Sequence, residues 1–287
     1  MIPIISNSLS RFRGQILGWG LSLGSLAALM TLFYDTIAEQ KDNYLKLMAN
    51  YPKEMLAFFS TGSVMEMFTP SGYLNIEFFS YMTIIIGIFV VLAGSGLLAG
   101  DEENGTLDLI LAHPVSRSVL FAGRSLAFLI ATIAILAITW LGFVAVVPRT
   151  MMDVSAGDLA LPLVSLFGIL AIFGSLSLLL SMLLPARRLA AMTSGILLVA
   201  CYFINALAQI DDVLEPIAKL LPFRYYQGGL AIDGMKWGQW AAMLAVSALF
   251  VIAAGWRFER RDIRVGGEGG WGLPVFSIRK ANKAAEE

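Results

Sequence analysis

The residues with the clearest potential for chemistry form one short acidic run, Asp101–Glu103, which is followed by the only histidine, His113. Clustered carboxylates at a membrane surface are what a metal-dependent lipid transferase requires, but they can equally form a docking surface for another protein. The hydroxyls of Gly174–Ser177 could suggest a serine protease, yet the only histidine, His113, is expected on the cytoplasmic side and no second histidine exists to serve as the base. The lone cysteine, Cys201, permits neither an internal disulfide nor a zinc or iron–sulfur site. A docking surface is therefore the favoured interpretation.

The residues after the acidic run predict a short helix with defined ends. Gly105 supplies a turn, and Thr106 is a good N-cap residue. Asp108 then places negative charge in the first helical turn, where the helix dipole favours it. Pro114 is expected to end this helix at His113, because the residue before a proline is disfavoured in helical geometry.

The predicted helix is amphipathic. Leu107, Ile110 and Leu111 form an apolar stripe that we expect to be presented to the cytoplasm as a surface for another protein. Ser116 is positioned to cap a second helix, which would run through Arg117 into the next apolar stretch.

The elements that must position this segment are membrane spans. Of the 287 residues, 57% are hydrophobic and only 14% are charged, whereas soluble domains are nearer half apolar and a quarter charged. Six uncharged stretches are long enough to cross a bilayer, and together they predict an all-α polytopic membrane protein. These stretches cover residues 16–34, 78–100, 125–148, 159–186, 189–210 and 237–256.

The distribution of basic residues predicts the orientation. If the N-terminus is cytoplasmic, 13 of the 20 lysines and arginines lie on the inner side and 7 on the outer side. We therefore expect both termini in the cytoplasm of a multi-pass protein of the inner (plasma) membrane. An apolar stripe over residues 2–12 predicts a helix in the inner interface that leads into span one.

The rest of the chain is assigned to loops and one tail. Residues 1–264 are expected to form a single six-span membrane domain, and residues 265–287 a flexible cytoplasmic tail. The outer loop 35–77 contains an amphipathic pattern, and the outer loop around residues 220–226 suits a short interfacial helix. The amphipathic pattern consists of Tyr44, Met48, Tyr51, Met55 and Phe59.

The run from Gly105 to Leu111, followed by His113-Pro114-Val115-Ser116-Arg117, resembles the coupling region of type-2 ATP-binding-cassette (ABC) permeases. Further segments resemble the antibiotic and multidrug exporter branch of that family, and the similarity extends over nearly the whole chain. These segments are Leu17–Gly20, Phe33-Tyr34, Pro70–Leu74, Pro222–Tyr226 and Phe258–Ile263.

The resemblance implies a half-transporter that exports an amphipathic drug, antibiotic or lipid-like substrate. The chain has no Gly-x-x-x-x-Gly-Lys-Ser/Thr loop, so ATP and Mg²⁺ would be held by a separate cytoplasmic ABC ATPase and no cofactor by this chain. The permease would pair with a second copy or a second permease, within membrane lipid and without nucleic acid. The implied ATPase-coupling residues are Glu102, Glu103, Gly105, Thr106, Leu107, Asp108, Ile110, Leu111, Pro114, Ser116 and Arg117.

Two other classes of protein stay open at this point: an ion-coupled carrier or channel, and an intramembrane enzyme. Carriers and channels usually keep charged residues inside their spans, and none of the six stretches contains one. Polar span residues could line a substrate path or simply bond one helix to another. These residues are Thr132, Thr139, Asn205 and Gln209. The pairs Gly20/Gly24 and Gly96/Gly100 could allow close helix approach, including at a dimer seam.

Overall fold

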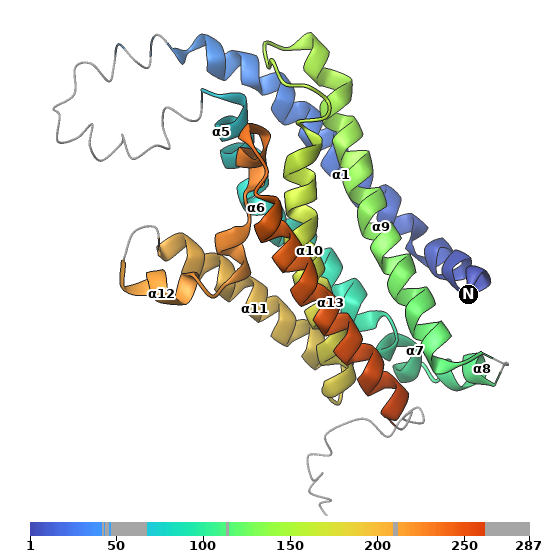
Figure 1. Ribbon diagram of the computed structural model, residues 1–287. Helices are drawn as coiled ribbons and strands as arrows, with labels where there is room; N and C mark the ends of the chain where they lie inside the picture. Colours follow the sequence, from blue (N-terminus) through green and yellow to red (C-terminus); the bar gives the residue numbers. More distant parts are fainter. Residues whose placement is uncertain (42, 44–45, 47–67, 113–114, 209–211, 262–287) are drawn as a thin grey trace, which may run out of the picture.

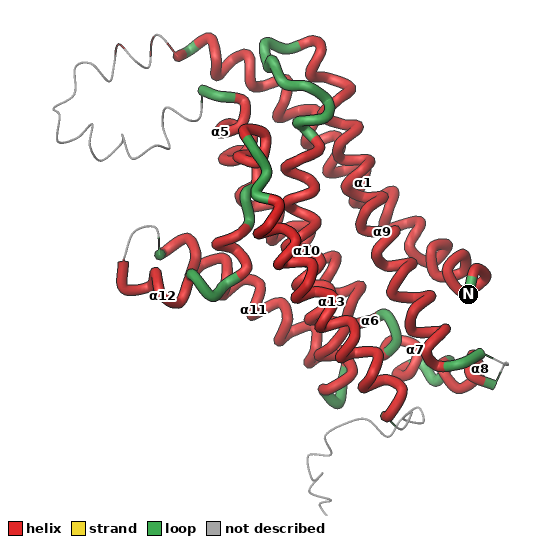
Figure 2. The backbone as a smooth tube through the Cα atoms, in the orientation of Figure 1, coloured by secondary structure: helices red, strands yellow, loops and turns green. Residues whose placement is uncertain are grey.

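The computed structural model describes residues 1–287 except 42, 44–45, 47–67, 113–114, 209–211 and 262–287. All regular secondary structure in the described part of the chain is helical, as predicted (Figure 2). Within the described residues, six helical segments are long and apolar enough to cross a membrane, which agrees with the predicted number. They are α1 (Ile2–Glu39), α5–η1–α6 (Pro70–Gly96), α9 with η2 (Arg117–Arg149), α10 (Ala160–Leu183), α11 (Arg187–Leu207) and α13 (Trp237–Arg260).

The helices extend beyond or stop short of the predicted span boundaries, and two of these differences change the interpretation. The expected interface helix over residues 2–12 is not a separate element, because α1 runs without a break through 38 residues. Nothing in residues 12–16 interrupts it, since Gly14 is tolerated within a strongly helical context. The fourth span is shorter than predicted, because α10 ends at Leu183 and Pro185 lies in the turn before α11.

Helix α10 is the central helix of the bundle. It packs against α6, α11 and α13, while α1 packs along the length of α9 (Figure 1). The core between them is strongly aromatic: Phe78, Phe143 and Phe173 are all fully buried. The rings of Phe78 and Phe143 meet edge to face with centroids 5.0 Å apart, a favourable aromatic geometry.

Glycines allow the close approach of α1 and α9. Gly24 and Gly142 face one another so closely that a side chain on Gly142 would overlap the carbonyl of Gly24. Gly20 packs against Ile138 in the same seam. The Gly20/Gly24 pair is therefore used for packing within this chain, and the suggestion that it forms a dimer seam is wrong.

At the end of the bundle opposite α7 and α8, the loop before α13 packs against a π-helix. The π-helix η1 (Asn75–Phe79) shifts the backbone hydrogen-bond pattern and leaves groups available to other elements. The hydroxyl of Tyr226 donates to the carbonyl of Phe79 at 2.9 Å, and the Asn75 side chain accepts from the amide of Gly229 at 3.0 Å. The loop contains the 3₁₀ helices η4 (Pro222–Tyr225) and η5 (Gly228–Asp233), so the short helix predicted near residues 220–226 is present. The amphipathic pattern from Tyr44 to Phe59 lies outside the described residues.

Candidate functional site

Two short helices, α7 (Ala99–Glu103) and α8 (Leu107–Leu111), connect the end of α6 to the start of α9 (Figure 1). They are separated by a turn at Gly105, whose φ of 66° lies in the left-handed region that glycine adopts without strain. The turn predicted at this glycine is confirmed. It reverses the chain and sets the two helices in contact with each other.

Asp101 is the most deeply engaged residue of the acidic run. Its side chain is 7% exposed and forms ion pairs with Arg124 of α9 and with Arg11 of α1, the latter at 3.1 Å. The hydroxyl of Thr106 also donates to its carboxylate, at 3.3 Å. A carboxylate in such a poorly solvated place is tolerated only when charged donors surround it, so Asp101 fixes α7 to both α1 and α9.

Glu102 joins α7 to a different set of helices. Its carboxylate pairs with the guanidinium of Arg261, immediately after α13. The same guanidinium donates to the carbonyl of Met182 at 3.2 Å, near the end of α10. Arg117, the first residue of α9, donates to the Arg261 carbonyl at 2.7 Å. Glu102 therefore lies at the meeting point of α13, α10 and α9.

Glu103 holds the start of α11. Its Oε1 accepts a hydrogen bond from the backbone amide of Arg187 at 2.8 Å. This amide is one of the N-terminal N–H groups that no intrahelical carbonyl can satisfy, and the helix dipole favours a carboxylate there. Because successive helical residues point about 100° apart, the run Asp101–Glu103 reaches three different groups of helices. We call Asp101, Glu102 and Glu103 the acidic hub.

The acidic hub differs from the docking surface that the sequence suggested. Asp101 and Glu102 are buried and engaged with arginines of their own chain, while Glu103 remains exposed. The physical reason is that the basic residues counted as topology signals lie close enough to neutralise the carboxylates. In the described part of the chain, no group of three or more His, Cys, Asp or Glu side chains converges as metal ligands would.

The apolar stripe of α8 exists, but it faces inward. Leu107 is only 1% exposed, and it packs in a cluster with Phe121 of α9 and Phe258 of α13. Ile110 and Leu111 are partly buried against the same cluster. The expectation that this stripe is presented to the cytoplasm is therefore wrong for Leu107, which packs in the protein's own core, while Ile110 and Leu111 are only partly covered.

The outward face of α8 consists of other residues. Leu109 is 68% exposed, and Asp108 beside it is also exposed. Asp108 lies in the first turn of α8, as predicted. Leu109 is not among the predicted coupling residues, because its neighbours Leu107, Ile110 and Leu111 carry the stronger helical spacing.

The predicted caps were only partly correct. Ser116 caps α9 by accepting from the amide of Val119 at 3.3 Å, which confirms its role. Thr106 occupies the N-cap position of α8, but its hydroxyl bonds to Asp101 and not to the helix amides. The helix ends at Leu111, two residues earlier than predicted, and Pro114 lies outside the described residues.

The structure does not gather the polar span residues into one site. Thr132 and Thr139 are buried in α9, where each hydroxyl donates to the carbonyl four residues earlier. Asn205 is half-buried on α11, and Gln209 lies outside the described residues. The two threonines are therefore satisfied within their own helix.

Six apolar helices, with an acidic hub that contacts their ends, define a polytopic helical membrane protein in which two short helices link the second and third spans. A family model described as ABC-2 family transporter protein matches residues 18–263. The chain belongs to this family, whose members are membrane subunits of transporters, and the resemblance to type-2 ABC permeases is confirmed. None of the curated proteins compared with the chain matches it.

Proposed function

We propose that the chain is the permease subunit of an ABC exporter and that a separate ATPase docks on the outward face of α8. The observation that carries this proposal is the acidic hub next to that helix. A displacement of α8 by the docked ATPase would be transmitted through Thr106, because its hydroxyl bonds to Asp101. Asp101 would pass it on to Arg11 of α1 and Arg124 of α9, with which it forms ion pairs. The same five-residue helix α7 contacts α11 and α13 through Glu103 and Glu102. Helix α7 therefore contacts the ends of four spans, α1, α9, α11 and α13.

Family membership supports the division of labour. ABC-2 permeases are membrane subunits paired with an ABC ATPase, so ATP and Mg²⁺ would be bound by the partner. The side carrying α7 and α8 would then face the cytoplasm, in agreement with the excess of basic residues on that side. We further propose that the substrate is amphipathic and that two permease subunits pair around its path in the plasma membrane.

The exposure of Leu109 provides the test. Leu109→Asp places a charge on the outward face of α8 without entering the core, so the chain should insert normally but retain much less ATPase on purification. The matched control is Leu220→Asp. Leu220 is 85% exposed and follows the C-terminal end of α11, whereas the hub bonds to the N-terminal end of that helix. We expect this control to retain the ATPase and to support transport. Equal ATPase retention by both variants and the unchanged chain would contradict the docking proposal, as would robust ATP hydrolysis by the chain purified alone.

A further inference from the structure

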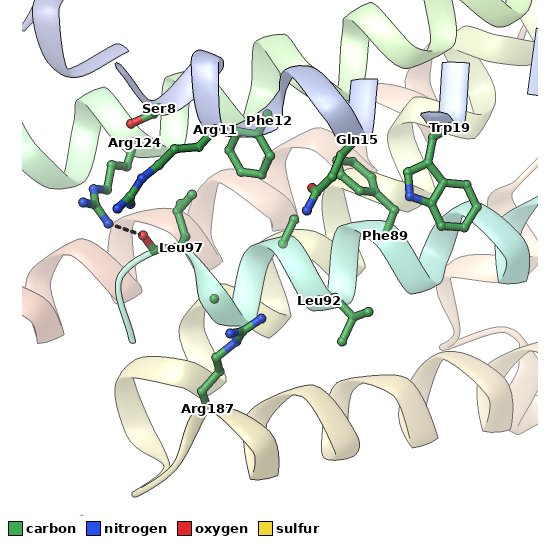
Figure 3. Close-up of a pocket in the computed structure, with 12 residues that line it drawn as sticks. Ser8, Arg11, Phe12, Gln15, Trp19, Phe89, Leu92, Leu97, Arg124 and Arg187 are labelled. Carbon is green, nitrogen blue, oxygen red and sulfur yellow. Dashed lines mark hydrogen bonds between the residues drawn. The ribbon is translucent and has the colours of Figure 1, made fainter. Parts of the chain in front are cut away.

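A pocket of 360 Å³ opens beside the acidic hub, between α1, α6, α9 and the start of α11 (Figure 3). Its polar end contains three guanidinium groups, those of Arg11, Arg124 and Arg187. Its other end is aromatic, with Phe12, Phe89 and Trp19 in its wall. Phe89 lies between the other two rings, at centroid distances of 6.5 Å from Phe12 and 6.4 Å from Trp19.

The polar end holds one buried donor for which the described residues supply no acceptor. Arg124 is 5% exposed and donates to the carbonyl of Leu97 at 2.7 Å, yet its Nε is buried and no residue that the structure describes accepts a hydrogen bond from it. A buried N–H without a partner costs about 1–3 kcal/mol, so a small shift of the Arg124 side chain that let a ligand accept from its Nε would be favoured. The guanidinium of Arg187 lies over the bare backbone of Gly96, where an added Cβ would come within 2.9 Å of it.

The charged groups around the pocket indicate which net charge a ligand should carry. Three arginines face the pocket, while the neighbouring carboxylates are Asp101, paired with two of them, and Glu103, bonded to the amide of Arg187. Glu102 is already matched by Arg261. The pocket therefore retains one uncompensated positive charge, which a single negative charge would neutralise.

We propose that this pocket binds an amphiphile with a monoanionic phosphodiester headgroup. The phosphate oxygens would accept from Arg187 and Arg124, since guanidinium groups bind phosphate through paired, charge-assisted hydrogen bonds. The apolar part of the ligand would lie along Phe12, Phe89 and Trp19. This inference goes beyond the proposed function, because it concerns ligand binding by the chain alone and does not require an ATPase.

The test uses the purified full-length chain in detergent, titrated with short-chain phosphatidylglycerol, short-chain phosphatidylcholine, glycerophosphoglycerol and inorganic phosphate. We expect phosphatidylglycerol to bind at least about tenfold more tightly than phosphatidylcholine, because only the former carries a net negative charge. Arg187→Gln should remove this preference without lowering the unfolding temperature, since the backbone amide that Glu103 holds is retained. Arg188→Gln is the matched control: Arg188 is the exposed next residue, does not line the pocket, and should leave the preference unchanged.

Other results of the same titrations would contradict the proposed lipid site or change its ligand. Equal binding of the two lipids, or an unchanged preference in Arg187→Gln, would overturn the proposal. Inorganic phosphate or glycerophosphoglycerol binding as tightly as phosphatidylglycerol would show that the aromatic wall contributes nothing, and the site would then be one for a free anion. Trp19→Ala should weaken binding of phosphatidylglycerol severalfold and leave binding of the two water-soluble phosphates unaltered.

Discussion

Nη1 of Arg11 lies 3.1 Å from Oδ1 of Asp101, although the two residues are 90 positions apart in the chain. Arg124 pairs with the other oxygen of the same carboxylate. A single buried carboxylate therefore bridges the first and third membrane helices at the point where α7 begins its link to α8. This arrangement makes the position of α7 depend on both helices.

Asp101→Asn should destabilise the protein strongly. The substitution removes the charge that compensates Arg124, which is almost completely buried, and breaking such a pair from one side costs about 3–5 kcal/mol. The measurement is thermal or denaturant unfolding of the purified chain in detergent. Asp108→Asn, at an exposed position in α8, serves as the control and should change stability by less than about 0.5 kcal/mol. Similar stabilities for the two variants would show that Asp101 does not anchor the hub.

Glu102 and Arg261 should be energetically coupled. In a double-mutant cycle with Glu102→Gln and Arg261→Gln, we expect an interaction energy of about 1–3 kcal/mol, because the two side chains pair in a largely buried place. Arg261 also donates to α10 carbonyls, so Arg261→Gln alone should cost more than Glu102→Gln alone. Additive effects of the two substitutions would contradict direct pairing.

Gly229→Ala should loosen the loop that lies on the π-helix. A Cβ at this position would come within 2.6 Å of the Ser71 carbonyl, which belongs to the backbone and cannot move aside cheaply. We expect a loss of about 1–3 kcal/mol in unfolding free energy. Gly238→Ala is the control, because nothing lies within 4 Å of its Cβ and it sits in the first turn of α13. Equal behaviour of both variants would argue against the close packing of Gly229 on η1.

The orientation of the chain can be measured by cysteine labelling. In a Cys201→Ser background, a membrane-impermeant maleimide added to intact cells should label Leu220→Cys and not Leu109→Cys. Both positions are exposed, so accessibility of the side chain does not bias the comparison. Opening the cells should make Leu109→Cys reactive. Labelling of Leu109→Cys in intact cells would place the hub outside and contradict the coupling proposal.

The sequence predicts the elements of this fold better than their contacts. The six spans, the turn at Gly105 and the cap at Ser116 follow from apolar length and local backbone preferences, and all are present. The partners of the acidic hub could not be predicted, because Arg11 and Arg261 come from distant parts of the chain. The orientation of α8 was mistaken for a related reason. An apolar stripe shows that a helix packs against something, but it does not distinguish a foreign partner from Phe258 of the same protein.

The π-helix was also beyond prediction. The wider i→i+5 hydrogen-bonded turn over Asn75–Phe79 leaves little trace in the hydropathy pattern, and the Phe79 carbonyl accepts a hydrogen bond from Tyr226, 147 residues later.

Photo-crosslinking at Leu109 tests the central claim most directly. A photoreactive amino acid replaces Leu109 in the full-length chain in cells, and the same replacement of Leu220 serves as the matched position. The proposal predicts that residue 109 alone yields an adduct with a separate polypeptide that contains a Gly-x-x-x-x-Gly-Lys-Ser/Thr loop, identified by mass spectrometry. A correctly inserted chain that gives no adduct with an ATP-binding polypeptide at position 109 would contradict the account.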